Sequence, residues 1–266
     1  MNKETLLNAE ENWVTGMGAW FPGETVIVRG NDLFTDLRDC SWMELLMLMV
    51  TGQRLEPKKV ELLDRMWALA VSYPDPRLWN NRIASLAGSA RSTGVLGVAA
   101  ATAVSEANVY GKQADMRAYD FLVRMKSLCD AGEQLKEVVF SELKNKRSLG
   151  GFGRPLVRRD ERIVPILELL AELGFQQGPH LKLVLTIEEL LENSRYKMSM
   201  NVGGLVAAIC CDLGFSMREY YGYIMIAFSA GHVACYFDAL DHPEGSFFPL
   251  RCSRIDYKGI GPRKWQ

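Results

Sequence analysis

The sequence predicts an all-α fold with one minor β element near the N-terminus. Three observations lead to this prediction: apolar residues recur at helical spacing along most of the chain, capping and glycine signals separate these segments, and strands do not alternate with helices. The chain has 266 residues, of which 48% are hydrophobic, so it can bury a large core.

The N-terminal part holds the strand-like run and the first two predicted helices. The β-branched run Thr25–Arg29 lies between two glycines and predicts a strand or one arm of a hairpin. Ser41 begins a capping box that opens a buried helix through Thr51, and Gly52 ends it. Pro57 lies at the start of the following helix, as proline commonly does.

An Ala- and Gly-rich helix is predicted at Ile83–Val104. Its small residues Gly88, Gly94 and Gly97 allow another backbone to approach closely, either in the core or at a subunit interface.

The remaining segments follow the same helical spacing. The predicted helices are Gln113–Cys129, Glu133–Leu143, Arg162–Leu173, Ile187–Asn193, one running from the Met200–Gly204 segment through Leu213, and one running from a capping box at Ser216 past His232. Between them, the segment 144–155 is first basic, then rich in glycine and closed by proline, which predicts a functional loop. The tail from His242 is predicted to be extended.

Composition excludes several classes of protein. Lys and Arg total 31 against 32 for Asp and Glu, so net charge gives no sign of a nucleic-acid partner. The polar N-terminus lacks a signal peptide, and the predicted apolar runs are shorter than the roughly 20 residues that span a bilayer. The 6 cysteines and 3 histidines show no metal-ligand spacing. A soluble, cytoplasmic protein without a metal site, a membrane segment or a nucleic-acid partner is therefore expected.

Several motifs, in the right order, carry a resemblance to one family. They are Val28–Gly30 through Gly52, the loop Gly151-Phe152-Gly153-Arg154-Pro155 with Arg158–Arg162 after it, Lys197–Gly204, Ala230–Ala234, and Ile255–Gly259 with Pro262 and Arg263. Together they resemble the citrate synthase and citryl-CoA lyase superfamily over most of the chain, and the length is similar to its short, lyase-like branch. The resemblance implies a single domain, 1–266, with a large helical subdomain (roughly 1–110 plus 200–266) and a small one (roughly 111–199). It also implies a homodimer.

The catalytic positions of that family are substituted here. The resemblance places Tyr110 where a histidine polarises the thioester carbonyl, and Arg154 where a second histidine stabilises the developing oxyanion. Gly203 falls where an aspartate removes the α-proton, and Phe228 falls where an arginine is usual. None of the family's acid–base residues is therefore present at its usual position.

Four residues remain as candidates for the chemistry. Tyr110 has a hydroxyl that donates hydrogen bonds, and Arg154 has a permanent positive charge for an oxyanion. Glu106 lies four residues before Tyr110, on the same face if the helix continues, and is the candidate replacement base. His232 lies within a predicted core helix, where a satisfied structural histidine is the alternative to a catalytic one.

The resemblance also assigns a ligand site. In the family the glycine-rich loop holds coenzyme A, which implies that Gly151, Phe152, Gly153, Arg154, Arg158 and Asn201 bind CoA or an acyl-CoA; the alternative is a glycine turn with a solvated basic face. CoA would be substrate or ligand, and no covalently bound cofactor is expected.

Two functions follow. The first is an enzyme that makes or cleaves a C–C bond of a CoA thioester by Claisen or retro-Claisen chemistry with an atypical site. The second is an inactive, CoA-binding, regulatory or partner subunit.

Overall fold

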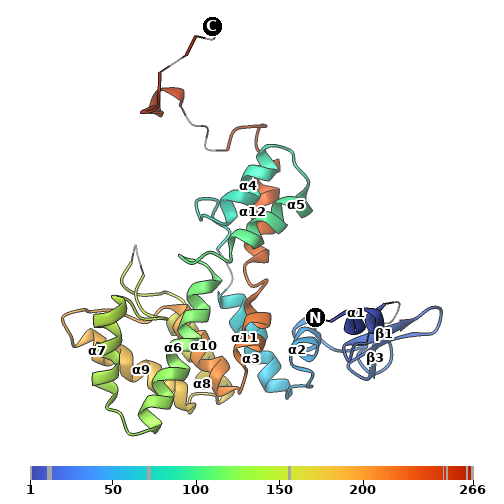
Figure 1. Cartoon of the computed structure of the whole chain (residues 1–266), viewed down its shortest axis with the longest axis vertical. Helices are drawn as coiled ribbons and strands as arrows, with labels where there is room; N and C mark the ends of the chain where they lie inside the picture. Colours follow the sequence, from blue (N-terminus) through green and yellow to red (C-terminus); the bar gives the residue numbers. More distant parts are fainter. Residues whose placement is uncertain are drawn as a thin grey trace. The chain divides into compact units, whose positions relative to one another are not determined.

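The computed structural model describes residues 2–10, 14–70, 73–154, 157–247, 249, 251–261 and 263–264, with the side chain of residue 252 excepted. Within them the protein is all-α with a small sheet, as predicted (Figure 1). Pro155 and Pro262, which belong to two of the motifs, lie outside the described residues.

Twelve α-helices are found among the described residues. They are α1 Lys3–Ala9, α2 Trp42–Thr51, α3 Pro57–Ala70, α4 Asn81–Ser89, α5 Gly94–Val104, α6 Lys112–Asp130, α7 Leu135–Lys146, α8 Ile163–Leu173, α9 Pro179–Glu192, α10 Val202–Asp212, α11 Met217–Ile224 and α12 Ser229–Leu240, and a 3-10 turn follows at Cys252–Arg254. The strands β1 Gly18–Phe21, β2 Thr25–Val28 and β3 Asn31–Asp32 form an antiparallel sheet in that order. The predicted strand at Thr25–Arg29 is confirmed as β2.

Contacts within the chain divide it into two compact units. Unit 1 comprises Met1–Val71 and Glu106–Ala227, and unit 2 comprises Ser72–Ser105 and Phe228–Gln266. The sequence boundaries of these units do not coincide with the predicted subdomain boundaries near residues 110 and 200. The division into a large and a small subdomain of the family type stays a prediction.

Unit 1 is built around α10, whose residues are buried from Gly203 to Cys210. The helix is apolar on every side, and such a helix is stable only when other helices surround it. It packs against α6 and α9, and the same core includes side chains of α2, α3, α7, α8 and α11. The beginning of α10 therefore lies at the edge of a fixed, closely packed scaffold.

Unit 2 contains α4, α5 and α12, which pack against one another (Figure 1). A Cβ at Gly88 would lie 2.5 Å from the carbonyl oxygen of Tyr236, and one at Gly97 would lie 2.6 Å from the Cβ of Ala87. The predicted role of these glycines in close helix packing is confirmed, and the packing is within the chain.

Two predicted helices are in fact interrupted. The segment Ile83–Val104 forms α4 and α5, because Arg91 between them adopts a positive φ of 54° that no α-helix tolerates. Its guanidinium donates hydrogen bonds to the carbonyls of Gly88, Ala239 and His242, which holds this corner in place. The helix predicted to run from Ser216 past His232 is likewise two helices, α11 and α12, separated by turns.

One stretch, Met217–Leu240, is long and apolar enough to cross a bilayer by length and composition. It comprises α11 and α12 with the turns between them, and it contributes the buried side chains of Tyr220, Tyr223 and His232. Buried helices of soluble proteins pass the same test, so this stretch alone does not indicate a membrane protein.

Candidate functional site

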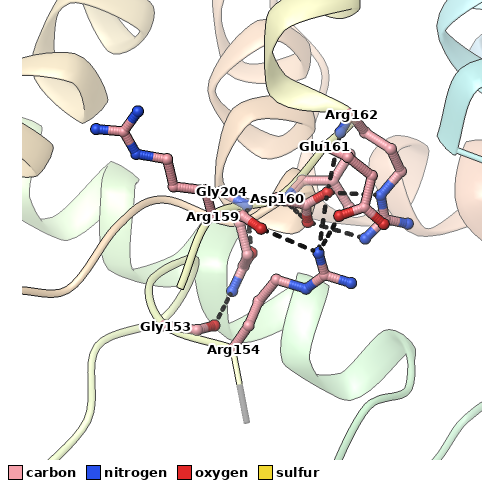
Figure 2. A network of polar contacts seen from close by, with 9 residues as sticks. Gly153, Arg154, Arg159, Asp160, Glu161, Arg162 and Gly204 are labelled. Atoms are coloured by element: carbon pink, nitrogen blue, oxygen red, sulfur yellow. Dashed lines mark hydrogen bonds and ion pairs between the residues drawn. The ribbon is translucent and has the colours of Figure 1, made fainter. Parts of the chain in front are cut away.

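The loop Gly150–Gly153 is bound edge to edge to the segment that begins α10. The N–H of Asn201 donates to the carbonyl of Gly151 (3.0 Å), and the Asn201 side-chain amide donates to the carbonyl of Gly153 (3.0 Å; Figure 2). The N–H of Gly153 in turn donates to the carbonyl of Ser199 (2.8 Å). The same Asn201 caps α10 by accepting from the N–H of Gly204 (3.1 Å). Two segments some 48 positions apart in sequence therefore form one assembly.

Glycine is required where these two backbones touch. Gly151 has a φ of 84°, and a Cβ on it would lie 2.6 Å from the Cα of Gly204. A Cβ on Gly204 would lie 2.5 Å from the carbonyl oxygen of Gly151. The loop glycines predicted to approach a ligand therefore approach α10 first, and the Gly153 N–H is already used by Ser199.

Phe152 anchors the loop in the core. Its side chain is buried and meets the ring of Phe121 on α6 edge-on, with 6.1 Å between centroids. An isolated β-bridge joins Phe152 to Met200. The Phe152 ring therefore contributes to the packing of unit 1.

The guanidinium of Arg154 is held by acidic side chains of the segment that follows it. Its Nη1 lies 2.5 Å from Oε2 of Glu161 and 3.7 Å from Oδ1 of Asp160, and it also donates to the carbonyl of Arg159 (3.4 Å; Figure 2). An oxyanion of a substrate would have to share this guanidinium with the two carboxylates.

Asp160 is the buried centre of that network. It accepts from Nε and Nη2 of Arg162 (2.8 and 2.9 Å) and from the N–H of Val202, the first residue of α10 (2.9 Å). Burial acts to raise its pKa, but the bonds and charge of Arg162 and the Val202 N–H outweigh burial and lower the pKa. Asp160 thus remains ionised and ties the segment after the loop to the positive end of α10.

Tyr110 and Glu106 are not on one helical face, so that expectation is wrong. Helix α5 ends at Val104, and Tyr110 has a φ of 65°, which breaks any helix that would join the two. Tyr110 is 58% exposed. The Glu106 carboxylate accepts from the Tyr221 hydroxyl (2.9 Å) and the Gln113 amide (3.2 Å). Glu106 is therefore already bonded through both of its oxygens.

His232 is completely buried and belongs to unit 2, whereas the glycine loop belongs to unit 1. Its ring nitrogens lie 3.5 Å from the hydroxyls of Thr102 and Ser105. Ser105 also accepts from the buried Asn80 (3.2 Å). These neighbours favour the interpretation of His232 as a hydrogen-bonded core histidine.

Arg158 lies on the surface after the loop. Its guanidinium is 3.8 Å from Glu192, a weak surface contact that leaves the group accessible to an anionic ligand.

Asp115 on α6 is the site residue that the sequence did not reveal. A Cβ at Gly203 would overlap the Oδ1 of Asp115, so this carboxyl occupies the space beside the first turn of α10. The side chain is half-buried. Burial raises its pKa from 3.8 to about 7, although the positive charges of Arg162, Lys112 and Arg117 act against that rise.

Lys112, at the start of α6, is the buried cation of the site, with 1% of its surface exposed. Burial lowers its pKa, while the charges of Glu106 and Asp115 act in the opposite direction. A carboxyl that titrates near neutrality thus lies at a helix N-terminus among cations, which is an arrangement able to accept and return a proton. Among the described residues, no cluster of His, Cys, Asp and Glu could hold a metal ion.

Comparison with known proteins agrees with this architecture. A model of the citrate synthase C-terminal domain matches residues 25–243. Citryl-CoA lyase from Hydrogenobacter thermophilus matches in structure with a TM-score of 0.82 and 21% identity, over 96% of this chain and 97% of that one. No curated protein matches the chain in sequence.

Two further solved structures share the fold. ATP citrate lyase from Methanosaeta concilii, in complex with (3S)-citryl-CoA, matches with a TM-score of 0.74 and 16% identity over 99% of this chain and 45% of that one. Citrate synthase from Thermotoga maritima matches with a TM-score of 0.67 and 20% identity, over 86% of this chain and 60% of that one. The family model covers most of the sequence and the fold agrees with it: this chain belongs to the citrate synthase family.

Proposed function

We propose that the protein is an enzyme that makes or cleaves a C–C bond in a CoA thioester, with an atypical active site. One observation carries the proposal: the glycine loop assigned to CoA and the start of α10, assigned to the reaction, are joined through Asn201 to Gly151 and Gly153. The related ATP citrate lyase was solved with (3S)-citryl-CoA bound, which supports a ligand of this class.

Exposed cations around the loop support the binding of CoA phosphates. Arg158 and Arg159 follow the loop, while Arg195 and Lys197 precede the segment that pairs with it, and all four are exposed. The ring of Tyr196 stacks on Phe140 in the middle of α7, a helix whose last turn carries Lys144 and Lys146. Guanidinium groups bind phosphate oxygens well, so these side chains suit the nucleotide end of CoA.

The alternative is an inactive CoA-binding, regulatory or partner subunit. The substitutions at Tyr110, Arg154 and Gly203 favour it, as does the pairing of Arg154 with Glu161 and Asp160. The enzyme and a CoA-binding subunit both require the CoA site, and only the enzyme requires turnover.

Calorimetric titration with CoA, acetyl-CoA and longer acyl-CoAs, followed by a citryl-CoA cleavage assay, tests the proposal. Arg158→Ala should weaken CoA binding roughly 5- to 30-fold, as expected for the loss of one charge-assisted contact to a phosphate. Arg218→Ala, at an exposed arginine in the first turn of α11, is the matched control and should bind normally. Binding without turnover would favour the inactive subunit, and no binding of any thioester would refute both.

We further propose a homodimer formed through unit 2. Large apolar side chains of α4, α5 and α12 are exposed there: Leu86, Val95, Leu96, Val104, Val233 and Phe237. Val95 is 85% and Leu96 is 63% exposed. Contiguous apolar side chains exposed to water are unfavourable on a monomer and often mark a protein–protein interface.

Light scattering should give the dimer mass for the wild type and the monomer mass for Leu96→Glu. Leu6→Glu, at an exposed leucine of α1, is the control and should remain dimeric. A monomeric wild type at micromolar concentration would contradict the proposal. A cytoplasmic location also stays a prediction.

A further inference from the structure

The beginning of α10 contains glycine at a position that faces a carboxyl from another helix. Gly203 is the second residue of α10, and a Cβ there would overlap Oδ1 and lie 3.4 Å from Cγ of Asp115. The carboxyl of α6 therefore fills the space that a side chain at residue 203 would take. A carboxylate is present at this helix N-terminus, although α10 itself does not supply one.

The surroundings of Asp115 differ from those of the other acidic groups nearby. Asp160 is saturated by Arg162 and the N–H of Val202, and Glu106 is bonded to Tyr221 and Gln113. By contrast, the structure shows no hydrogen bond or ion pair to the Asp115 carboxyl from any residue that it describes. Of these three carboxyl groups, that of Asp115 is therefore the one without a hydrogen bond or ion pair to a described residue.

Charged and titratable groups act on Asp115 from its own helix, from the start of α8 and from α11. Lys112 and Arg117 lie on α6 itself, Arg162 lies at the start of α8, and the buried Tyr220 hydroxyl lies on α11. The charge of Asp115 contributes to the raised pKa of Tyr220, behind burial as the main cause. Three cations and a helix N-terminus stabilise the ionised carboxyl, whereas partial burial favours the protonated form.

The balance between these effects places the pKa of Asp115 at about 7. Both the carboxylate and the carboxylic acid are then populated near neutral pH, as an efficient general acid or base requires. Asp115 is partly exposed rather than sealed in the core.

We propose that Asp115 is the proton-transferring group of this site and takes the place of the carboxyl that α10 lacks at Gly203. This inference rests on the proposed function as a CoA-thioester enzyme. In the step, the Cα–H bond of the acyl group breaks and the proton passes to a carboxylate oxygen of Asp115. The electron pair of that bond moves toward the thioester carbonyl, whose oxygen becomes the enolate oxygen, and the reverse step returns the proton to carbon.

Exchange of α-protons for solvent deuterium isolates this step from any co-substrate. Acetyl-CoA, propionyl-CoA and butyryl-CoA are incubated with the protein in D2O, and mass spectrometry follows deuterium at the α-carbon. Asp115→Asn should lower the exchange rate at least about 100-fold, the usual contribution of general acid–base catalysis. Asp120→Asn, one turn and a half along α6, is the control and should exchange like the wild type, because Asp120 is exposed and paired with Arg124.

A swap of the carboxyl from one helix to the other gives a second test. Gly203→Asp alone clashes with the Asp115 side chain and should exchange slowly, whereas Asp115→Ala removes both the clash and the carboxyl. The double variant Asp115→Ala/Gly203→Asp should therefore exchange faster than either single variant. Thermal unfolding of each variant identifies any that fail to fold.

The outcomes separate this inference from the proposed function. Wild-type exchange that Asp115→Asn retains would overturn the role of Asp115 and leave the proposed function standing. No exchange by the wild type with any of the three thioesters would overturn the proposed enzyme and this role together. Loss of exchange in Asp115→Asn with normal CoA affinity, and its recovery in the double variant, is the expected result.

Discussion

Replacing Asp115 with Asn should stabilise the folded protein at high pH and change it little at low pH. Burial holds the pKa of Asp115 near 7 in the folded chain, against an ordinary value of 3.8. Between these values the folded chain keeps a proton that the unfolded chain has released, so a rise in pH favours unfolding. The cost of the ionised carboxyl is absent below about pH 4 and complete above about pH 7.

The size of the effect follows from the shift in pKa. A shift of about 3 units at about 1.4 kcal/mol per unit corresponds to at most about 4 kcal/mol. Because the side chain is only half-buried, water screens part of this cost, and we expect about 2 kcal/mol. Asn has nearly the same shape as Asp and carries no charge, so it removes the pH dependence while it keeps the packing.

Urea denaturation followed by circular dichroism, at several values between about pH 5 and 8, measures this difference. The gap in unfolding free energy between Asp115→Asn and the wild type should widen as the pH rises. Asp120→Asn, an exposed control on the same helix, should change stability by less than about 1 kcal/mol at every pH. If the difference in unfolding free energy between Asp115→Asn and the wild type is the same at every pH, the reasoning is refuted.

Three further substitutions test the scaffold of the site. Gly151→Ala should cost about 2 kcal/mol or more, because it strains a residue at positive φ and presses a Cβ on Gly204; an unchanged melting temperature would contradict the close contact. Asp160→Asn should cost about 3 kcal/mol at neutral pH because it removes the buried negative charge that pairs with Arg162, and the gap to the wild type should shrink in acid because the folded pKa of Asp160 is lowered. His232→Ala should destabilise the protein by about 3 kcal/mol in calorimetric melting and leave CoA affinity unchanged; a selective loss of affinity would instead make the histidine functional.

Local signals in the sequence predicted much of the fold. The capping box at Ser216 is complete in the structure, with Glu219 accepting from the Ser216 N–H. The one predicted at Ser41 is half-formed: Ser41 accepts from the Glu44 N–H, while the Glu44 carboxylate pairs with Arg54 instead. A short-range pattern fixes which residues are able to cap a helix, and tertiary neighbours decide which partner they take.

The breaks in the long helices could not be predicted from the sequence, because they too depend on tertiary neighbours. Arg91 adopts a positive φ without being glycine, and its guanidinium donates to two carbonyls that are distant in sequence, those of Ala239 and His242, as well as to that of Gly88. The distant partners cannot be seen in the local sequence, so the corner is not marked there. Tyr110 likewise breaks the path from α5 to α6 at a positive φ. Both residues look like ordinary helix members in a pattern of apolar spacing.

The site residues that belong to sequence motifs could be predicted, whereas the residue that depends on tertiary packing could not. The loop glycines and Asn201 do meet, as their motifs implied. Asp115 stands near Arg117 and Asp120 in an amphipathic helix, where an acidic residue is usually a solvated surface group. Packing that includes the approach of α10 at Gly203 makes it a half-buried carboxyl, and burial raises its pKa.

The contact between Gly151 and Gly204 has a consequence for how this site tolerates change. No side chain lies between the two backbones, so no side chain can change rotamer to accommodate a shift of one backbone against the other. A ligand that pushes on the loop therefore pushes directly on the opening turn of the helix that carries Gly203. Variant libraries aimed at new substrates should hold this pair fixed and diversify the exposed residues around it.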